Sequence, residues 1–264
     1  MKEKVAKKLN INRKKAWRIA SNIAYPLLAF ALVLAVWAIV AKVKDNPLVL
    51  PMPSVVLARF FTLCTEQDFW ASVGMSVART LICFFIAFVF ALLFALLGGL
   101  FKPLHKVLSP IVAFLRSAPT VAVILILYAF TSSEIMAVTV GFLIAFPIMY
   151  STFYSAIVGV DKDLIEMAKI YKFSPLDKVR CIYLPCIAEC LFDTSKSTIS
   201  LTLKVVVAAE ILTSISKSIG GKIAVANSTF EIAYLLSWTI VAIFFSFALE
   251  GIVALLKKLW EVLK

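Results

Sequence analysis

The sequence lacks the residue patterns of most hydrolases, metal sites and nucleotide-binding sites. No G-x-x-x-x-G-K-[ST] loop occurs, and GGKI at residues 220–223 lacks both the spacing and the hydroxyl of such a loop. The G-x-S-x-G and H-E-x-x-H motifs are also missing. The single histidine, His105, is expected to lie in a loop rather than to act as a ligand or base. We therefore predict a chain without enzymatic activity, metal or cofactor, which cannot hydrolyse ATP alone.

Cysteine and charge are sparse as well. The five cysteines do not have the spacing of a disulfide framework, and Cys181, Cys186 and Cys190 lack the histidines that a zinc cluster usually recruits. Only 16% of the residues are charged, whereas 62% are hydrophobic, and the mean hydropathy is +0.99. Soluble domains are nearer half apolar, so this composition excludes them and places the chain in a bilayer.

Long apolar runs are what the sequence has instead. A helix needs roughly 20 apolar residues to cross about 30 Å of hydrocarbon, where no water satisfies the backbone. We predict an all-α integral membrane protein with six transmembrane helices. The first run follows a basic segment but is long enough to span, and no clean A-x-A site follows it, so we interpret it as an anchor. The six predicted spans are residues 23–43, 73–100, 108–130, 135–160, 187–215 and 232–256.

The distribution of Lys and Arg predicts the orientation. Eighteen of them lie in the N-terminal segment 1–22, the turn at 102–106, the segment 161–185 and the C-terminal tail, against five in the opposite loops. Because cytoplasmic loops carry the excess of positive charge, we place the first group and both termini in the cytosol. Topology and anionic lipid then explain much of the net charge of +12 without nucleic acid.

The charged segment 161–185 has the pattern of two short helices. Leu164, Ala168 and Tyr171 recur at i, i+4 and i+7, which gives the first helix one apolar face. Residues 174–177, SPLD, have the serine, proline and acidic residue of a helix start. We expect the second helix to end at Leu184-Pro185. The pair would form a projecting cytosolic loop, and an amphipathic hairpin lying on the membrane surface fits the pattern equally well.

This segment resembles the signature of permease subunits of binding-protein-dependent ABC importers, which is E-A-A, three residues, G, nine residues and I-x-L-P. The chain has EMA at 166–168, Lys172 in the glycine place and IYLP at 182–185. A left-handed turn would suit the glycine, and Lys172 would cost about 1 to 2 kcal/mol in that conformation. The segments LPMPS (50–54), LRSAP (115–119) and KVVVAAEIL (204–212) resemble the nitrate/sulfonate/taurine branch.

The resemblance implies a type I ABC importer permease fold, with residues 23–264 as a six-span permease domain and 161–185 as a coupling loop. It implies a homodimer in the bacterial plasma (inner) membrane, with two copies of an ABC ATPase subunit and an extracytoplasmic solute-binding protein. The solute would be a small organic anion such as a sulfonate or taurine, or nitrate, or a thiamine-precursor pyrimidine. Residues that would couple to the ATPase are Glu166, Met167, Ala168, Tyr171, Lys172, Ile182, Leu184 and Pro185.

Polar residues of the predicted fifth span share one face, which we call the polar stripe. At 100° per residue its members fall within an arc of about 80°. Charges at membrane depth cost about 2.5 to 3.5 kcal/mol each unless paired or wetted, so we interpret the stripe as a wall of the translocation path. A structural ion pair between Asp193 and Lys196 is an equal alternative for its cytosolic half. The stripe consists of Glu189, Asp193, Lys196, Ser200 and Lys204.

Two further charged residues are candidates for the path. Glu210 lies about 120° off the stripe and is expected to meet another helix of this subunit or of its copy. Arg116 is a gate residue or an inner-leaflet anchor, and Pro119 and Pro147 are expected to kink their helices. The pathway candidates are thus Lys196, Ser200, Lys204, Glu210 and Arg116.

Two other functions fit the sequence. One is an ion-gradient-driven transporter or channel, and the absence of a visible inverted repeat counts against it. The other is a membrane scaffold whose cytosolic loop recruits a partner.

Overall fold

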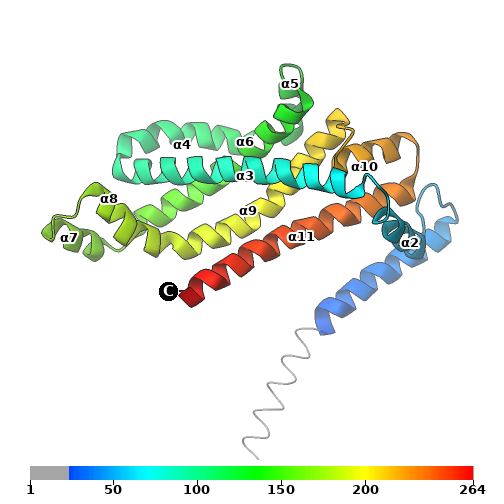
Figure 1. The fold of residues 1–264 in the computed structure, drawn as a ribbon, viewed down its shortest axis with the longest axis horizontal. Coiled ribbons are helices and arrows are strands. Elements are labelled where there is room, and N and C mark those ends of the chain that lie inside the picture. Colours follow the sequence, from blue (N-terminus) through cyan, green and yellow to red (C-terminus); the bar gives the residue numbers. More distant parts are fainter. Residues whose placement is uncertain (1–23, 264) are drawn as a thin grey trace, which may run out of the picture.

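The computed structural model describes residues 24–263, and every regular element among them is helical, which confirms the all-α prediction. Four helices in this described part are each long and apolar enough to cross a membrane. A further helix, α9 (Leu184–Thr213), has 30 residues but is more polar and is not one of these four. The shape is an elongated bundle whose long helices run roughly along its length (Figure 1). The four apolar helices are Ala24–Lys44, α3 (Phe69–Leu100), α6 (Ser133–Val158) and α11 (Ile232–Leu263).

The core of the bundle is formed by α3, α6, α9 and α11, in which α6 packs against α3 and α9, and α11 packs against α9. Ala87, Ala91 and Ala95 repeat every four residues on α3 and are fully buried. Small side chains at this spacing let two helix backbones approach closely, which is the main source of helix association in lipid. Gly141 on α6 belongs to the same interface, because an added Cβ there would lie 2.6 Å from Cys83 Sγ.

The predicted span 108–130 is not one continuous helix. It is divided into α4 (Lys102–Ser117) and α5 (Thr120–Tyr128), whose axes differ by 95°. Ala118 adopts an extended ψ of 131° because the ring of Pro119 disfavours the helical conformation of the residue before it. In contrast, α6 continues through Pro147 as a single helix. The expected kink at Pro119 is therefore a break.

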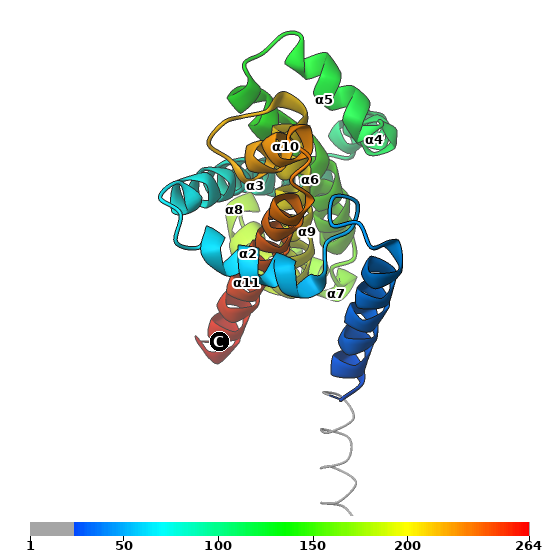
Figure 2. The same ribbon diagram turned by 90° about the vertical axis from the view of Figure 1, so that its right-hand side faces the viewer.

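The N-terminal helix, Ala24–Lys44, stands beside the bundle (Figure 2). Only 6% of its most apolar window is buried within the chain. Trp37 Nε1 donates to the Pro51 carbonyl at 3.2 Å, just before α2 (Pro53–Leu63), which packs on α11. This helix agrees with the predicted first span, whereas the predicted cytosolic segment 1–22 lies outside the described residues.

The C-terminal third of the chain contains a short helix that the span prediction did not include. α9 ends at Ser214, whose φ of 51° is left-handed, and α10 (Ile219–Ser228) folds back against α9 and α11. α11 extends to Leu263 and is thus longer than the predicted span 232–256. α10 lies at one end of the bundle, and α7 (Lys162–Ile170) and α8 (Pro175–Lys178) lie at the other (Figure 1).

His105 lies in a helix and not in a loop, so that prediction was wrong. It is in the first turn of α4 and is half-buried against α6. Its ring stacks on Tyr154 with centroids 3.6 Å apart, and Nδ1 lies 2.9 Å from the Tyr150 hydroxyl. α4 begins at Lys102 and has Pro103 in its first turn, so the helix starts early enough to include His105 and to bring it into the α4–α6 contact.

Candidate functional site: the coupling loop and the polar face of α9

The first helix of the coupling loop, α7, contacts the hydrophobic core through Ala168 and Ile165. The Asp161 side chain caps it by accepting a hydrogen bond from the Asp163 backbone N–H at 3.0 Å. Ala168 is fully buried and belongs to the main hydrophobic core together with Ile182 and Tyr183. Ile165 of the same helix is half-buried and also packs against this core.

Lys172 adopts the conformation that the glycine of the signature would favour. Its φ is 53°, and its N–H donates to the Lys169 carbonyl at 3.1 Å. The N–H of Phe173 donates to the Ala168 carbonyl at 2.9 Å, which completes a Schellman motif at the end of α7. Phe173 packs against the core beside Ala168. The turn is therefore kept despite the lysine, at the cost of about 1 to 2 kcal/mol for a side chain in the left-handed region.

The predicted start of the second loop helix is confirmed, and its predicted end is not. Ser174 and Asp177 form a reciprocal capping box at the start of α8, with the Asp177 N–H 3.2 Å from Ser174 Oγ. The chain then passes through a π-helical turn, η1 (Val179–Tyr183), directly into α9. Pro185 lies in the first turn of α9, and Leu184 has helical φ and ψ of −59° and −47°.

A proline in this position was expected to terminate a helix because it has no N–H and its ring clashes with a carbonyl one turn back. The π turn wraps more residues into that turn, and this removes the clash. As a result, the coupling loop is joined to α9 without an interruption of the helix.

The outer surface of the coupling loop is unusually apolar for a charged segment. Met167, Ile170, Tyr171 and Leu176 are exposed, and Ile170, Tyr171 and Leu176 are each at least 70% exposed. Among the predicted coupling residues, Ala168 and Ile182 are buried and Leu184 is half-buried. The remaining five, Glu166, Met167, Tyr171, Lys172 and Pro185, are exposed. The loop thus presents apolar and charged side chains together at one end of the bundle.

The polar stripe of α9 is divided by the structure. Lys196 and Lys204 are exposed, and no ion pair joins either of them to another residue in the described part of the chain. Ser200 between them is 4% exposed. Asp193 pairs with Lys257 of α11, with Oδ1 2.8 Å from Nζ, so the alternative of an Asp193–Lys196 pair is wrong. Asp193 pairs with Lys257 and not with Lys196 of the next turn because α11 packs directly against α9.

Glu210 meets other helices of its own subunit, as one of the two alternatives predicted. Its side chain is fully buried, and Oε1 lies 3.0 Å from Arg79 Nη1 on α3. Ser76 Oγ donates to Oε2 at 2.7 Å, and the backbone N–H of Gly220 donates to the same atom at 3.1 Å. Glu210 therefore faces the interior of this subunit, unlike Lys196 and Lys204. It holds the N-terminus of α10 against α3 and α9.

Three residues of this polar cluster were not found from the sequence. Arg79 and Ser76 lie in the most apolar span, and Glu134 at the start of α6 contacts Arg79 Nη2 at 3.3 Å. Since a charge inside a membrane span needs a partner, a lone arginine in such a run was a sufficient signal to search for one. The partner itself could not be chosen from the sequence, because 131 residues separate Arg79 from Glu210.

Arg116 lies at the bend between α4 and α5. It is exposed, and its Nη1 is 3.5 Å from Ser151 Oγ on α6.

The five cysteines are free, and no group of three or more His, Cys, Asp or Glu side chains within residues 24–263 could hold a metal ion. The candidate site therefore consists of the coupling loop at one end and the exposed lysines of α9 further along.

Comparisons with known proteins agree with this geometry. A family model described as the binding-protein-dependent transport system inner membrane component matches residues 87–261. The aliphatic sulfonates transport permease protein SsuC of Escherichia coli (strain K12) is 35% identical over 158 residues, which are 58% of this chain and 59% of that protein. The chain thus aligns with about three-fifths of the length of the curated relative that it matches.

Solved structures of ABC transporters share the fold. A chain of the MetNI methionine ABC transporter in an inward-facing conformation matches with a TM-score of 0.58 and 20% identity, over 72% of this chain and 97% of that one. A chain of a bacterial ABC transporter involved in the import of the acidic polysaccharide alginate matches with a TM-score of 0.64 and 16% identity, over 91% and 98%. The predicted importer permease fold is thereby confirmed, and the number of six spans stays a prediction.

Proposed function

The chain belongs to the family of binding-protein-dependent transport system inner membrane components, and from this premise we propose that it carries a small organic anion, such as a sulfonate, into the cell. As a member of this family it is a multi-pass permease subunit of an ABC importer in the inner membrane, and ATP hydrolysis belongs to a separate subunit. One observation carries the proposal: α9 bears the exposed Lys196 and Lys204 and continues without a break from the coupling loop. The helix that would meet the anion is thus joined to the part that would contact the ATPase.

The proposed assembly is a homodimer with two ATPase subunits and one extracytoplasmic solute-binding protein. The apolar tip formed by Met167, Ile170, Tyr171 and Leu176 would dock in a groove of the ATPase, and Glu166 would add a charged contact. Exposed apolar side chains rimmed by charge are typical of such docking surfaces. With the coupling loop in the cytosol, both chain termini are proposed to be cytosolic and α10 to lie at the outer end of the bundle.

The proposed mechanism is alternating access. ATP binding would close the ATPase pair and draw the two coupling loops together. Three side chains attach the loop to the core, namely Ala168, Ile182 and Tyr183. Because η1 joins the loop to α9, movement at the tip would be transmitted to the whole helix. The exposed face of α9 would then open toward the outside, and hydrolysis would return it to the inside.

The solute class is proposed from charge and from similarity. Lys204 and Lys196 are exposed on one helix, and an anion in transit would offer the partner that neither has in the described chain. Similarity to a sulfonate permease favours a sulfonate over nitrate or a neutral pyrimidine. A second copy would contribute the same two lysines to a shared path.

The proposal is tested with the complex in proteoliposomes that contain the permease, the ATPase and the binding protein. We expect ATP-dependent uptake of a sulfonate or taurine, with stimulation of ATPase activity by the loaded binding protein. Uptake that needs an ion gradient and no ATP would identify a secondary transporter instead. Binding of the ATPase without any flux would leave a scaffold as the function.

A further inference from the structure

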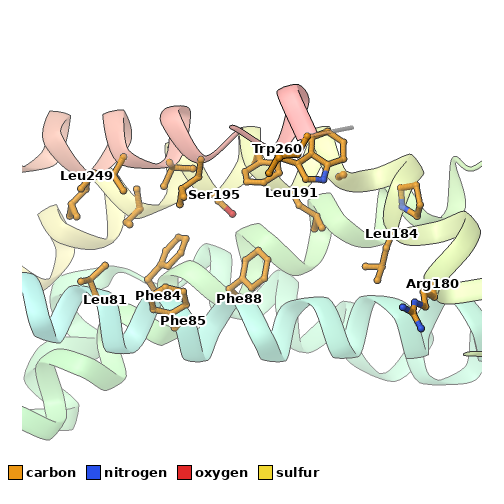
Figure 3. A pocket seen from close by; sticks show the side chains of 18 residues that line it. Leu81, Phe84, Phe85, Phe88, Arg180, Leu184, Leu191, Ser195, Leu249 and Trp260 are labelled. Atoms are coloured by element: carbon orange, nitrogen blue, oxygen red, sulfur yellow. The ribbon is translucent and has the colours of Figure 1, made fainter. Parts of the chain in front are cut away.

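An apolar groove runs between α3, α9 and α11 (Figure 3), and we call it the α3–α9–α11 groove. Its volume is about 880 Å³, within the range of small-molecule sites. Its walls come from three helices and are formed almost entirely by aliphatic and aromatic side chains. Representative lining residues are Phe84, Phe88, Leu191, Ile199, Leu249 and Ile252.

The groove has one charged end. Among the described residues that line the groove, only Arg180 of η1 is charged, and it lies beside Leu184 at the end nearest the coupling loop (Figure 3). Within residues 24–263, no hydrogen bond or ion pair joins its guanidinium to another side chain. Ser195 supplies the only hydroxyl in the lining. The chemistry is therefore that of a site for an amphiphile with an anionic head and an apolar tail.

The groove lies away from the proposed path. At 100° per residue, the lining residues Ala188, Ser195 and Ile199 are about 140° to 180° around α9 from Lys204. From Pro185 to Ile199 the helix rises about 21 Å, which is more than half of the hydrocarbon thickness of about 30 Å. A ligand in this groove would thus run along the outer side of α9, from the membrane surface to beyond its midplane.

We propose that the α3–α9–α11 groove binds an anionic phospholipid of the cytosolic leaflet, with Arg180 on the phosphate and an acyl chain between the three helices. The placement in that leaflet rests on the cytosolic position of the coupling loop in the proposed function. A planar guanidinium matches phosphate geometry, and basic pockets between spans on the cytoplasmic side are suited to anionic head groups. The bound lipid would support the stretch of α9 next to the coupling loop.

Charge argues against the other apolar occupant that this chain offers, the N-terminal helix of a second copy. Residues 4–44 contain no acidic residue, and Lys14, Lys15 and Arg18 precede the helix. If that helix occupied the groove, it would bring no carboxylate to Arg180. An anionic lipid, in contrast, neutralises the guanidinium.

The test uses the permease–ATPase complex purified in detergent, stripped of lipid and titrated with phosphatidylglycerol or phosphatidylcholine. The readouts are the thermal unfolding midpoint and the phospholipid retained per complex in native mass spectrometry. We expect phosphatidylglycerol to stabilise the complex more than phosphatidylcholine. Arg180→Gln should weaken phosphatidylglycerol binding about five-fold, which is the contribution of one cation to the affinity for an anionic head group. Lys178→Gln, which removes a neighbouring cation outside the groove, should leave binding unchanged.

A second pair of variants tests the apolar part. Ile252 and Ile243 are about half exposed on α11, but only Ile252 lines the groove. Ile252→Trp should reduce retention of both lipids, and Ile243→Trp should not. Equal effects of both lipids on the native complex, or equal effects of the paired variants, would overturn the proposal. So would crosslinking of two copies through Ile252→Cys, because the groove would then be an interface between subunits.

These readouts contain no solute and no flux. Failure of lipid binding would therefore leave the importer function standing, and failure of solute uptake would leave the lipid site standing. Arg180→Lys covers the case in which Arg180→Gln does not fold. It keeps the charge and should retain the preference for phosphatidylglycerol, with weaker binding because a lysine lacks the planar fork.

Discussion

Arg79 Nη1 and Glu210 Oε1 lie 3.0 Å apart in the interior of the bundle, where the Arg79 side chain is 6% exposed and that of Glu210 is not exposed at all. The carboxylate also accepts from Ser76 and from the first turn of α10. Ser76 Oγ in turn accepts from the Ile219 N–H at 2.9 Å. One ion pair therefore fixes three helices and the segment that follows α9.

We predict that Glu210→Ala destabilises the subunit by about 3 to 5 kcal/mol, because it leaves a buried arginine without its carboxylate. The measurement is the thermal unfolding midpoint and the yield of monodisperse protein. Glu134→Gln is the matched control: its side chain is 68% exposed on the other side of Arg79, and its loss should cost about 1 kcal/mol or less. Equal losses in the two variants would show that Arg79 does not depend on Glu210.

The glycines at the start of α10 should not tolerate a methyl group. A Cβ on Gly220 would lie 2.5 Å from both Glu210 Cβ and the Val207 carbonyl oxygen, and one on Gly221 would overlap the Ile215 carbonyl oxygen. Gly220→Ala and Gly221→Ala should each cost about 1 to 3 kcal/mol, as overpacking of a core does. The added Cβ in Gly74→Ala or Gly251→Ala meets nothing within 4 Å. A thermal scan of the four variants should separate the two pairs.

Lys172→Gly should stabilise the coupling loop. Lys172 has a φ of 53°, where glycine avoids a cost of about 1 to 2 kcal/mol. Limited proteolysis between α7 and α8 measures local opening of the loop, and it should become slower. Lys172→Ala removes the same charge but keeps a Cβ, so it should show no gain, and equal protection in both variants would assign the effect to charge.

Lys204→Met should lower solute flux in the reconstituted complex by about ten-fold. This factor corresponds to the loss of one charge-assisted hydrogen bond to the solute, which contributes about 1.5 kcal/mol. Lys204 is exposed on α9, so the amount of folded protein should not change. Lys204→Arg should retain part of the flux because it keeps the charge but not the shape. Lys44→Met, which removes a lysine at the end of the N-terminal helix, is the control. Normal flux in Lys204→Met would exclude Lys204 from the path.

The topology is tested with single cysteines in a background without native cysteines. Leu176 lies in the coupling loop and Ser216 between α9 and α10, and both are exposed. Leu176→Cys should react with a membrane-impermeant reagent only from the cytosolic side, and Ser216→Cys only from the opposite side. Reaction of both from one side would contradict the orientation predicted from Lys and Arg.

The order of the long helices could be predicted from the sequence because the length of an apolar run is a local property, and the capping box at Ser174 is local in the same way. The partner of Glu210 could not be predicted, since Arg79 is its neighbour only after α3 and α9 have packed. The prediction that a helix ends at Leu184-Pro185 failed for a related reason. A π turn depends on the register of a whole helix, and no single residue encodes it.

The bend at Pro119 also determines which solvent can reach this part of the molecule. Backbone groups at a helix break lack helical partners, and hydrocarbon cannot satisfy them. Ser117 Oγ and the Ala118 N–H both donate to the Phe114 carbonyl, so the other carbonyls at the end of α4 depend on water or on another chain. Arg116, exposed at the same place, needs hydration as well. Acyl chains alone therefore cannot cover the bend, which needs either water or a partner chain at this place.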